Sequence, residues 1–184
     1  MDVSAIEEDL RLQIQNGDSA AGETLLHLAN TIISGADSML AQSSKKKGIG
    51  RKEAQTAHRF LEKALLLVTS KFAASLSRHH AQGKDVERMR LSALSHAYAV
   101  LGKLHELLGN NHIALRYLES AIDHARRGGA PSAQLHVSAS AVASGLGLHR
   151  DGLSHATAAL AELADIYESA VSFYEVVEST RCAQ

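Results

Sequence analysis

The chain has 184 residues and a net charge of −1, with one proline, one cysteine and no tryptophan. This length predicts one domain or a piece of a longer repeat array. One cysteine excludes a framework of internal disulfides, and no apolar run is long enough to cross a membrane. Because the N-terminus is acidic rather than basic and apolar, we expect a reduced, cytoplasmic protein without a secretory signal.

Apolar residues recur at helical spacing along most of the chain, which predicts an all-α protein. Glycine, asparagine and proline mark the places where one helix ends and the next begins. The expected helices cover approximately residues 3–16, 20–42, 52–80, 86–108, 112–126, 133–145 and 151–180.

Two of the segments between helices have distinctive compositions. Residues 43–52 contain two glycines and five basic residues, which predicts a flexible Lys-rich loop. Gly128, Gly129 and Pro131 form the clearest break in the chain. The larger segment 45–90 carries twelve basic and four acidic residues, a net charge of +8, and is the part of the chain best suited to an acidic partner.

One segment of the chain is repeated. Residues 57–65 recur as residues 114–122, with five of nine positions identical and two others conservatively exchanged. An internal repeat of this kind predicts helical units that stack on one another and present a continuous surface to a partner.

Residues 95–128 resemble a tetratricopeptide repeat. They carry the large residues, the Leu-Gly pair and the small residues of that family at its spacing, namely Tyr98, Leu101, Gly102, His105, Gly109, Ala114, Leu118 and Ala121. Small side chains at Gly102, Ala114 and Ala121 would let two antiparallel helices approach closely. The segment departs from the family at His105, where an aromatic residue is usual, and at Arg126, where a proline is usual.

Weaker echoes of the same pattern lie on both sides. A shift of 38 residues aligns Leu108 and Gly109 with Leu146 and Gly147. An earlier unit pairs Gly35 with small and large residues of the following helix. The turn of this unit is longer, and the Lys-rich loop supplies its extra residues. The residues paired with Gly35 are Ala57, Leu61 and Ala64.

The resemblance therefore implies about three antiparallel helix pairs, stacked as a short right-handed solenoid over residues 20–165. Residues 1–19 would form an N-terminal helical extension, and residues 166–184 the C-terminal helix end and tail. An unrelated helical bundle is the alternative, because Ala-rich helices with small residues at helical spacing occur in any bundle.

No constellation of catalytic or metal-binding residues is visible in the sequence. The eleven histidines never stand three or four residues apart, as a metal-binding pair on one helix face requires. No serine lies in a Gly-x-Ser-x-Gly elbow, and the glycines of the Lys-rich loop lack phosphate-binding spacing. We expect no enzymatic activity, no metal and no cofactor.

The expected function is protein binding by a scaffold or adaptor. The resemblance implies that a concave face, which would hold a peptide or helix, includes His96, Lys103 and Glu106 of the central repeat and Gln134 of the next. The Lys and Asn clamp of chaperone-binding members is missing, because Ala99 and Val137 stand at two of its positions.

The last expected helix is apolar on two sides. Leu160 and Tyr167 belong to one stripe, and Ile166, Phe173 and Val177 lie on another face. Because repeat arrays usually end in a polar face, Phe173 and Val177 are expected to bind a partner or a second copy. A longer array, or coverage by the N-terminal helix, would also explain this apolar surface.

Two other functions remain open at this point. A helical bundle could bind nucleic acid through residues 45–90, although aromatic residues are not interleaved with the bases as stacking would require. The third possibility is a structural subunit of a cytoskeletal assembly. The salt dependence of binding separates nucleic acid from protein partners.

Overall fold

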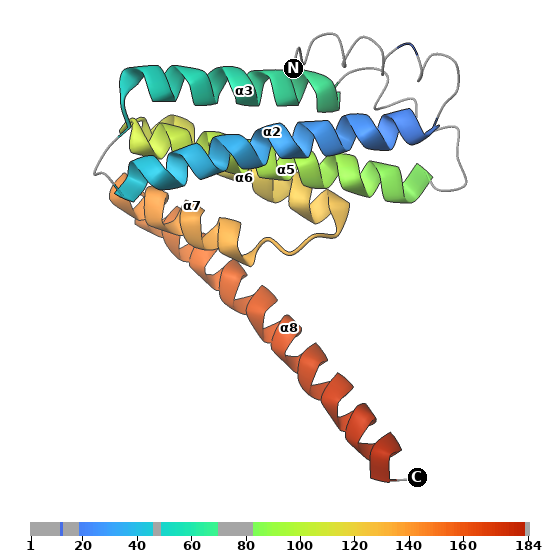
Figure 1. Ribbon diagram of the computed structural model, residues 1–184. Coiled ribbons are helices and arrows are strands. Elements are labelled where there is room, and N and C mark those ends of the chain that lie inside the picture. Colours follow the sequence, from blue (N-terminus) through green and yellow to red (C-terminus); the bar gives the residue numbers. More distant parts are fainter. Residues whose placement is uncertain (1–11, 13–18, 46–48, 70–82, 183–184) are drawn as a thin grey trace. The chain divides into compact units, whose positions relative to one another are not determined.

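The computed structural model describes residue 12 and residues 19–45, 49–69 and 83–182 (Figure 1). Every element within these ranges is an α-helix, which confirms the all-α prediction. The helix expected over residues 3–16 lies, apart from residue 12, outside the described residues. The helices are α2 (Ser19–Lys45), α3 (Arg51–Thr69), α5 (Gly83–Leu107), α6 (Asn111–Gly128), α7 (Ala133–Gly145) and α8 (His149–Cys182).

The chain forms two compact units that meet in sequence between Ala130 and Pro131. The first unit contains α2, α3, α5 and α6, and the second contains α7 and α8. The repeat domain expected over residues 20–165 thus contains this division, which falls in the break marked by Gly128, Gly129 and Pro131.

In the first unit, α2 packs against α3 and α5, α3 packs against α5, and α5 pairs with α6 (Figure 1). Each helix contributes apolar residues three or four apart, so that one stripe faces the core. In α3, for example, Ala57, Leu61 and Ala64 are fully buried. Two buried clusters result. One is centred on Leu26 and Leu67, and the other on Ile33 and Leu104.

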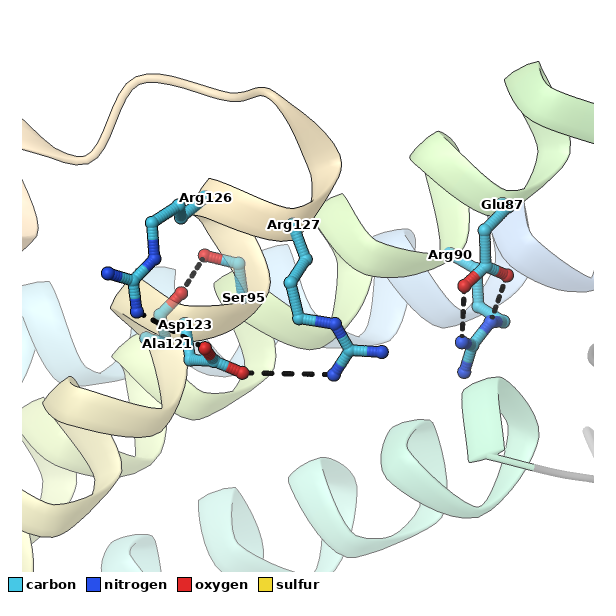
Figure 2. Close-up of polar contacts among 7 residues, drawn as sticks. All are labelled: Glu87, Arg90, Ser95, Ala121, Asp123, Arg126 and Arg127. Carbon is cyan, nitrogen blue, oxygen red and sulfur yellow. Dashed lines mark hydrogen bonds and ion pairs between the residues drawn. The ribbon is translucent and has the colours of Figure 1, made fainter.

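The α5–α6 pair is unusually close at Gly102. A Cβ at this position would lie 2.9 Å from Cγ of Leu118 and 3.3 Å from the carbonyl oxygen of Ala114. Along the same pair, Ser95 Oγ donates a buried hydrogen bond of 2.9 Å to the carbonyl oxygen of Ala121 (Figure 2). The predicted close approach through small residues is therefore confirmed for this pair.

The corresponding prediction for Gly35 is wrong. A Cβ at Gly35 would meet nothing within 4 Å, and the neighbouring Ala36 is the residue buried in the core. The reason is a one-residue offset, which on an α-helix turns the side chain by about 100°. Small residues do line the α2–α3 contact, but Gly35 is not one of them.

The connection from α2 to α3 is shorter than the Lys-rich loop expected over residues 43–52. Helix α2 extends to Lys45 and α3 begins at Arg51, so both ends of that segment are helical. Buried Ser43 donates hydrogen bonds to the Met39 carbonyl and to Oε2 of Glu53, at 3.1 and 3.2 Å. The same Glu53 oxygen accepts the Gly50 backbone N–H at 3.3 Å. Glu53 therefore holds the end of α2 to the start of α3.

In the second unit, α7 and α8 form a helical hairpin of unequal arms. Small residues permit the contact, since a Cβ at Gly152 of α8 would lie 2.7 Å from Ser144 Oγ of α7. At the open end, the backbone N–H and the hydroxyl of Ser132 both donate to the Glu162 carboxylate, at 2.6 and 2.8 Å. Helix α7 has 13 residues and α8 has 34, so α8 continues beyond its partner (Figure 1).

Candidate interaction surface

Helix α8 exposes a long row of apolar side chains, called here the α8 face. Tyr167 and Phe173 are 71% and 72% exposed, and every side chain from residue 163 to residue 173 is exposed. The α8 face comprises Leu153, Leu160, Leu163, Ile166, Tyr167, Val171 and Phe173.

The α8 face has the periodicity of a helix that packs against other helices. Leu153, Leu160 and Tyr167 are seven residues apart, as are Ala156 and Leu163 three residues further on. In a heptad, these two series occupy the a and d positions, which form the seam of a coiled coil. This periodicity therefore favours the packing of a second helix along α8.

A second series of residues, also seven apart, shows how far α7 covers α8. Gly152 and Ala159 are buried in the hairpin with α7. The next two positions at the same spacing are Ile166 and Phe173, and both are exposed. The surface that α7 covers in the first half of α8 thus continues as open apolar surface in the second half, within the described part of this unit.

The acidic residues of α8 stand away from the seam. Asp165 and Glu168 occupy f and b positions of the heptad, which point outward. Glu162 is engaged by Ser132 at the end of the hairpin. The seam and its flanks are consequently free of charge between Leu153 and Phe173.

The concave-face residues expected on α5 have mixed surroundings. Lys103 is held by an ion pair of 2.8 Å between its Nζ and Oδ1 of Asp37 on α2. His96 is half-buried and Glu106 is exposed. These three lie on one helix, whereas Gln134 is exposed on α7 in the other unit. Of the α8 residues expected to bind, Phe173 is exposed, and Val177 lies in α8 with its side chain outside the described residues.

A column of rings runs between α5 and α6, and sequence reasoning missed it. Tyr98 and His105 of α5 alternate with Tyr117 and His124 of α6. The ring centroids are 5.3 Å apart for His105 and Tyr117, and 5.3 Å apart for Tyr98 and His124. His105 thereby stacks on Tyr117 as an aromatic side chain would. The visible signal was the seven-residue spacing of a tyrosine and a histidine in each helix.

Both histidines of this column have pKa values below the ordinary value of a histidine. Burial lowers the pKa of His105, and the nearby His58 lowers it further. Burial also lowers the pKa of His124, with Arg127 adding to the effect. The Nδ1 atoms of both rings are buried without a hydrogen-bond partner. The column is a packing feature of the first unit, and its histidines do not converge on a common point.

The basic segment over residues 45–90 is partly neutralised where it is described. Arg90 donates two hydrogen bonds, of 2.6 and 2.7 Å, to the carboxylate of Glu87 (Figure 2). The hydrogen bond to Arg90 lowers the pKa of Glu87. Further along, Asp123 forms ion pairs with Arg126 and Arg127. Of these arginines only Arg90 belongs to the segment 45–90, so its contact with Glu87 neutralises one basic residue there.

Within the described ranges, no group of three metal-ligating side chains comes together. His136 and His155 do meet across the α7–α8 hairpin, with their Nδ1 atoms 3.0 Å apart. One ring must donate and the other accept, so the contact joins the two helices. The spacing of residues in the sequence could not predict this pair, because its members come from different helices.

Compared with known proteins, the chain matches no family model, no curated protein and no solved structure. In the part of the chain that the structure describes, no helix combines the length and apolar character that a membrane span requires. What the protein does must therefore be inferred from its own surfaces, among which the α8 face stands out by its row of exposed apolar side chains.

Proposed function

We propose that the protein is a non-catalytic protein–protein interaction module, a scaffold or adaptor built from helix pairs of the tetratricopeptide type. The single observation that carries this proposal is the α8 face. Monomeric proteins rarely expose a contiguous apolar surface of this extent, and such surfaces mark sites where another protein binds.

The packing order of the first unit supports the repeat assignment. In a stack of helix pairs, the first helix of one pair rests on both helices of the pair before it. Helix α5 contacts both α2 and α3, and then pairs with α6 through Gly102. A solenoid of right-handed pairs accounts for these contacts and for the repeated segment 57–65.

The proposed binding surfaces differ in character. The α8 face offers apolar area, whereas His96 and Glu106 on α5 offer polar groups around the Lys103–Asp37 ion pair. Affinity is expected to come from the first surface, because desolvated apolar and aromatic side chains dominate interface energies. The α5 residues would contribute specificity for a peptide or helix.

The test is a capture experiment with the full chain and two matched variants. Leu163→Ser with Phe173→Ser removes two exposed side chains of the α8 face, and Asp165→Asn with Glu168→Gln changes the outward side of the same helix. We expect captured protein to be lost with the first variant and retained with the second, with similar helicity in both.

The same experiment distinguishes the nucleic-acid alternative. Binding through phosphate contacts weakens steeply as salt is raised, whereas an apolar seam is less sensitive. Captured material that is mainly nucleic acid, that is lost at high salt and that is indifferent to the Leu163 and Phe173 changes would overturn the proposed function.

A further inference from the structure

We propose that the α8 face binds the α8 face of a second copy of this chain, with the two helices antiparallel. This inference rests on the proposed function, because it names the partner of the same surface. A second copy fits the seam in its periodicity, its charge, its side-chain sizes and its area.

Periodicity is the first argument. The a and d series of α8 repeat every seven residues, from Leu153 through Tyr167 and from Ala156 through Ala170. A strict seven-residue repeat suits a partner helix that carries the same repeat, because each side chain must enter a hole formed by four residues opposite. A second α8 carries the same repeat from Leu153 to Ala170.

Charge is the second argument. The sequence contains no lysine or arginine from residue 151 to residue 180, and the acidic side chains at Asp165 and Glu168 point away from the seam. Between Leu160 and Phe173, the positions that flank the seam are Ala164, Ile166, Val171 and Phe173, all apolar. Two identical seams therefore meet without repulsion between like charges, and no basic rim is needed on the partner.

Side-chain size selects the antiparallel orientation. In a parallel pair, a residues face a′ residues and d residues face d′ residues, which would stack Tyr167 on Tyr167 and Ala170 on Ala170. In an antiparallel pair, a faces d′, so that Tyr167 of each copy meets Ala170 of the other. Large then packs against small in these two central layers, which favours close packing there.

One register of the antiparallel pair also brings the apolar flanking residues of the two copies together. With Tyr167 opposite Ala170 of the second copy, Ile166 lies beside Phe173 and Ala164 lies beside Val171. The centre of the pair then falls between residues 168 and 169, in the part of α8 that α7 does not cover. The most exposed section of the α8 face is thus the section that becomes most buried.

The area available matches that of a specific dimer. Burying a large apolar side chain corresponds to roughly 60–120 Å² at the usual transfer coefficient. The six side chains of the α8 face from Leu160 to Phe173 in each copy would then bury about 700–1,400 Å² in total, and specific interfaces bury about 1,200–2,000 Å². The expected dimer lies at the lower end, so its population should depend on protein concentration.

The experiment measures the mass of the full chain in solution as a function of concentration. The monomer has a mass of 19.6 kDa, and we expect the wild-type protein to approach twice that value. Ala170→Arg places a charge in the seam, and Ser172→Arg places the same charge on the outward side, two residues away. Both positions are exposed, so neither change should unfold the hairpin.

We expect Ala170→Arg to remain a monomer and Ser172→Arg to dimerise like the wild type. A wild-type protein that is monomeric at all concentrations would overturn the inference, as would equal dimerisation of both variants. If the chain stays monomeric but still captures another protein through the α8 face, the proposed function survives and the second copy is wrong. If neither occurs, both proposals fail.

Orientation has its own readout. A spin label at Ser154→Cys, in a chain with Cys182→Ser, lies far from the centre of the proposed pair. The helical rise places the two labels about 45 Å apart in the antiparallel register. A parallel pair would hold them at roughly the spacing of packed helices, about 10 Å plus the label arms, and that short distance would exclude the antiparallel arrangement.

Discussion

Gly102 and Gly35 are both helical glycines, and their surroundings give opposite signs to the same substitution. Gly102→Ala places a Cβ 2.9 Å from Leu118 Cγ, so the α5–α6 pair must separate. We expect the free energy of unfolding to fall by about 1–3 kcal/mol. Gly35→Ala meets open space and gains helix propensity, so we expect an increase of up to about 1 kcal/mol.

Denaturant unfolding of the two variants beside the wild type checks this pair of predictions. Each serves as the control for the other, because both exchange a helical glycine for alanine. A stabilising Gly102→Ala would show that α5 and α6 do not approach as closely as described, and would weaken the repeat assignment.

We expect the histidines of the ring column to make the first unit sensitive to acid. His105 and His124 have lowered pKa values in the folded state, whereas unfolded histidines bind a proton near about pH 6.5. The unfolded chain therefore binds more protons as the pH falls through that value, and the free energy of unfolding decreases until the pH is below the folded pKa values. Glu87, with its lowered pKa, adds a further loss only at more acidic pH, below its ordinary value of 4.5.

Melting temperatures at about pH 7.5 and about pH 5.5 measure this effect. We expect the double variant His105→Phe with His124→Phe to keep the ring stacking and to show a smaller loss on acidification than the wild type. His112→Gln, at an exposed position, is the matched control and should behave like the wild type. An unchanged pH dependence in the double variant would assign the acid sensitivity to other groups.

At the scale of elements, Glu53 decides how the α2–α3 connection behaves. It accepts hydrogen bonds from Ser43 and from the Gly50 backbone. Glu53→Ala removes the acceptor of both hydrogen bonds. We expect the free energy of unfolding to fall by about 0.5–2 kcal/mol and trypsin to cleave faster between Lys45 and Arg51. Glu62→Ala, on the exposed side of α3, is the control. Equal cleavage rates in the two variants would show that the Glu53 contacts do not protect the connection.

The sequence predicts the bounds of a helix best where residues next to the helix, such as proline or glycine, end it. Helix α7 lies over residues 133–145 as expected, because Pro131 precedes it and Gly147 follows it, with a backbone φ of 77°. The Lys-rich loop was predicted to be longer than it is. The contact at the end of α2 joins Ser43 to Glu53, ten residues away, and no local pattern reveals it. The ring column and the His136–His155 pair also depend on contacts between helices, and no spacing within one helix reveals them.

The candidate site was predictable in part for the same reason. The heptad spacing of Leu160 and Tyr167 is a local signal, and it correctly indicated an apolar stripe. That stripe is exposed at Leu153, Leu160 and Tyr167 alike. The other series, which continues from Ala159 to Ile166 and Phe173, is open only beyond α7, and the Ser132–Glu162 contact marks that limit. The ion pair of Lys103 with Asp37, on a helix 66 residues away in sequence, was likewise invisible.

At the scale of the whole molecule, we expect the first unit to fold without the second. Both buried clusters of the first unit are built from α2, α3 and α5. A chain that stops after Ala130 should therefore keep the helicity and melting temperature of the first unit, as circular dichroism would show. A truncated chain that melts much earlier would mean that α7 or α8 contributes to that core. The comparison should be made with the Ala170→Arg variant of the full chain, so that dimerisation does not enter.

Helix α8 has 34 residues, which corresponds to a rod of about 51 Å. In the proposed antiparallel pair, the starts of the two rods lie at opposite ends, about 60 Å apart. The helix then acts as a ruler that fixes the spacing of two attached modules. Inserting seven residues near its start would lengthen that spacing by about 20 Å without disturbing the seam, whereas inserting five would turn the α7 hairpin to another side of the rod.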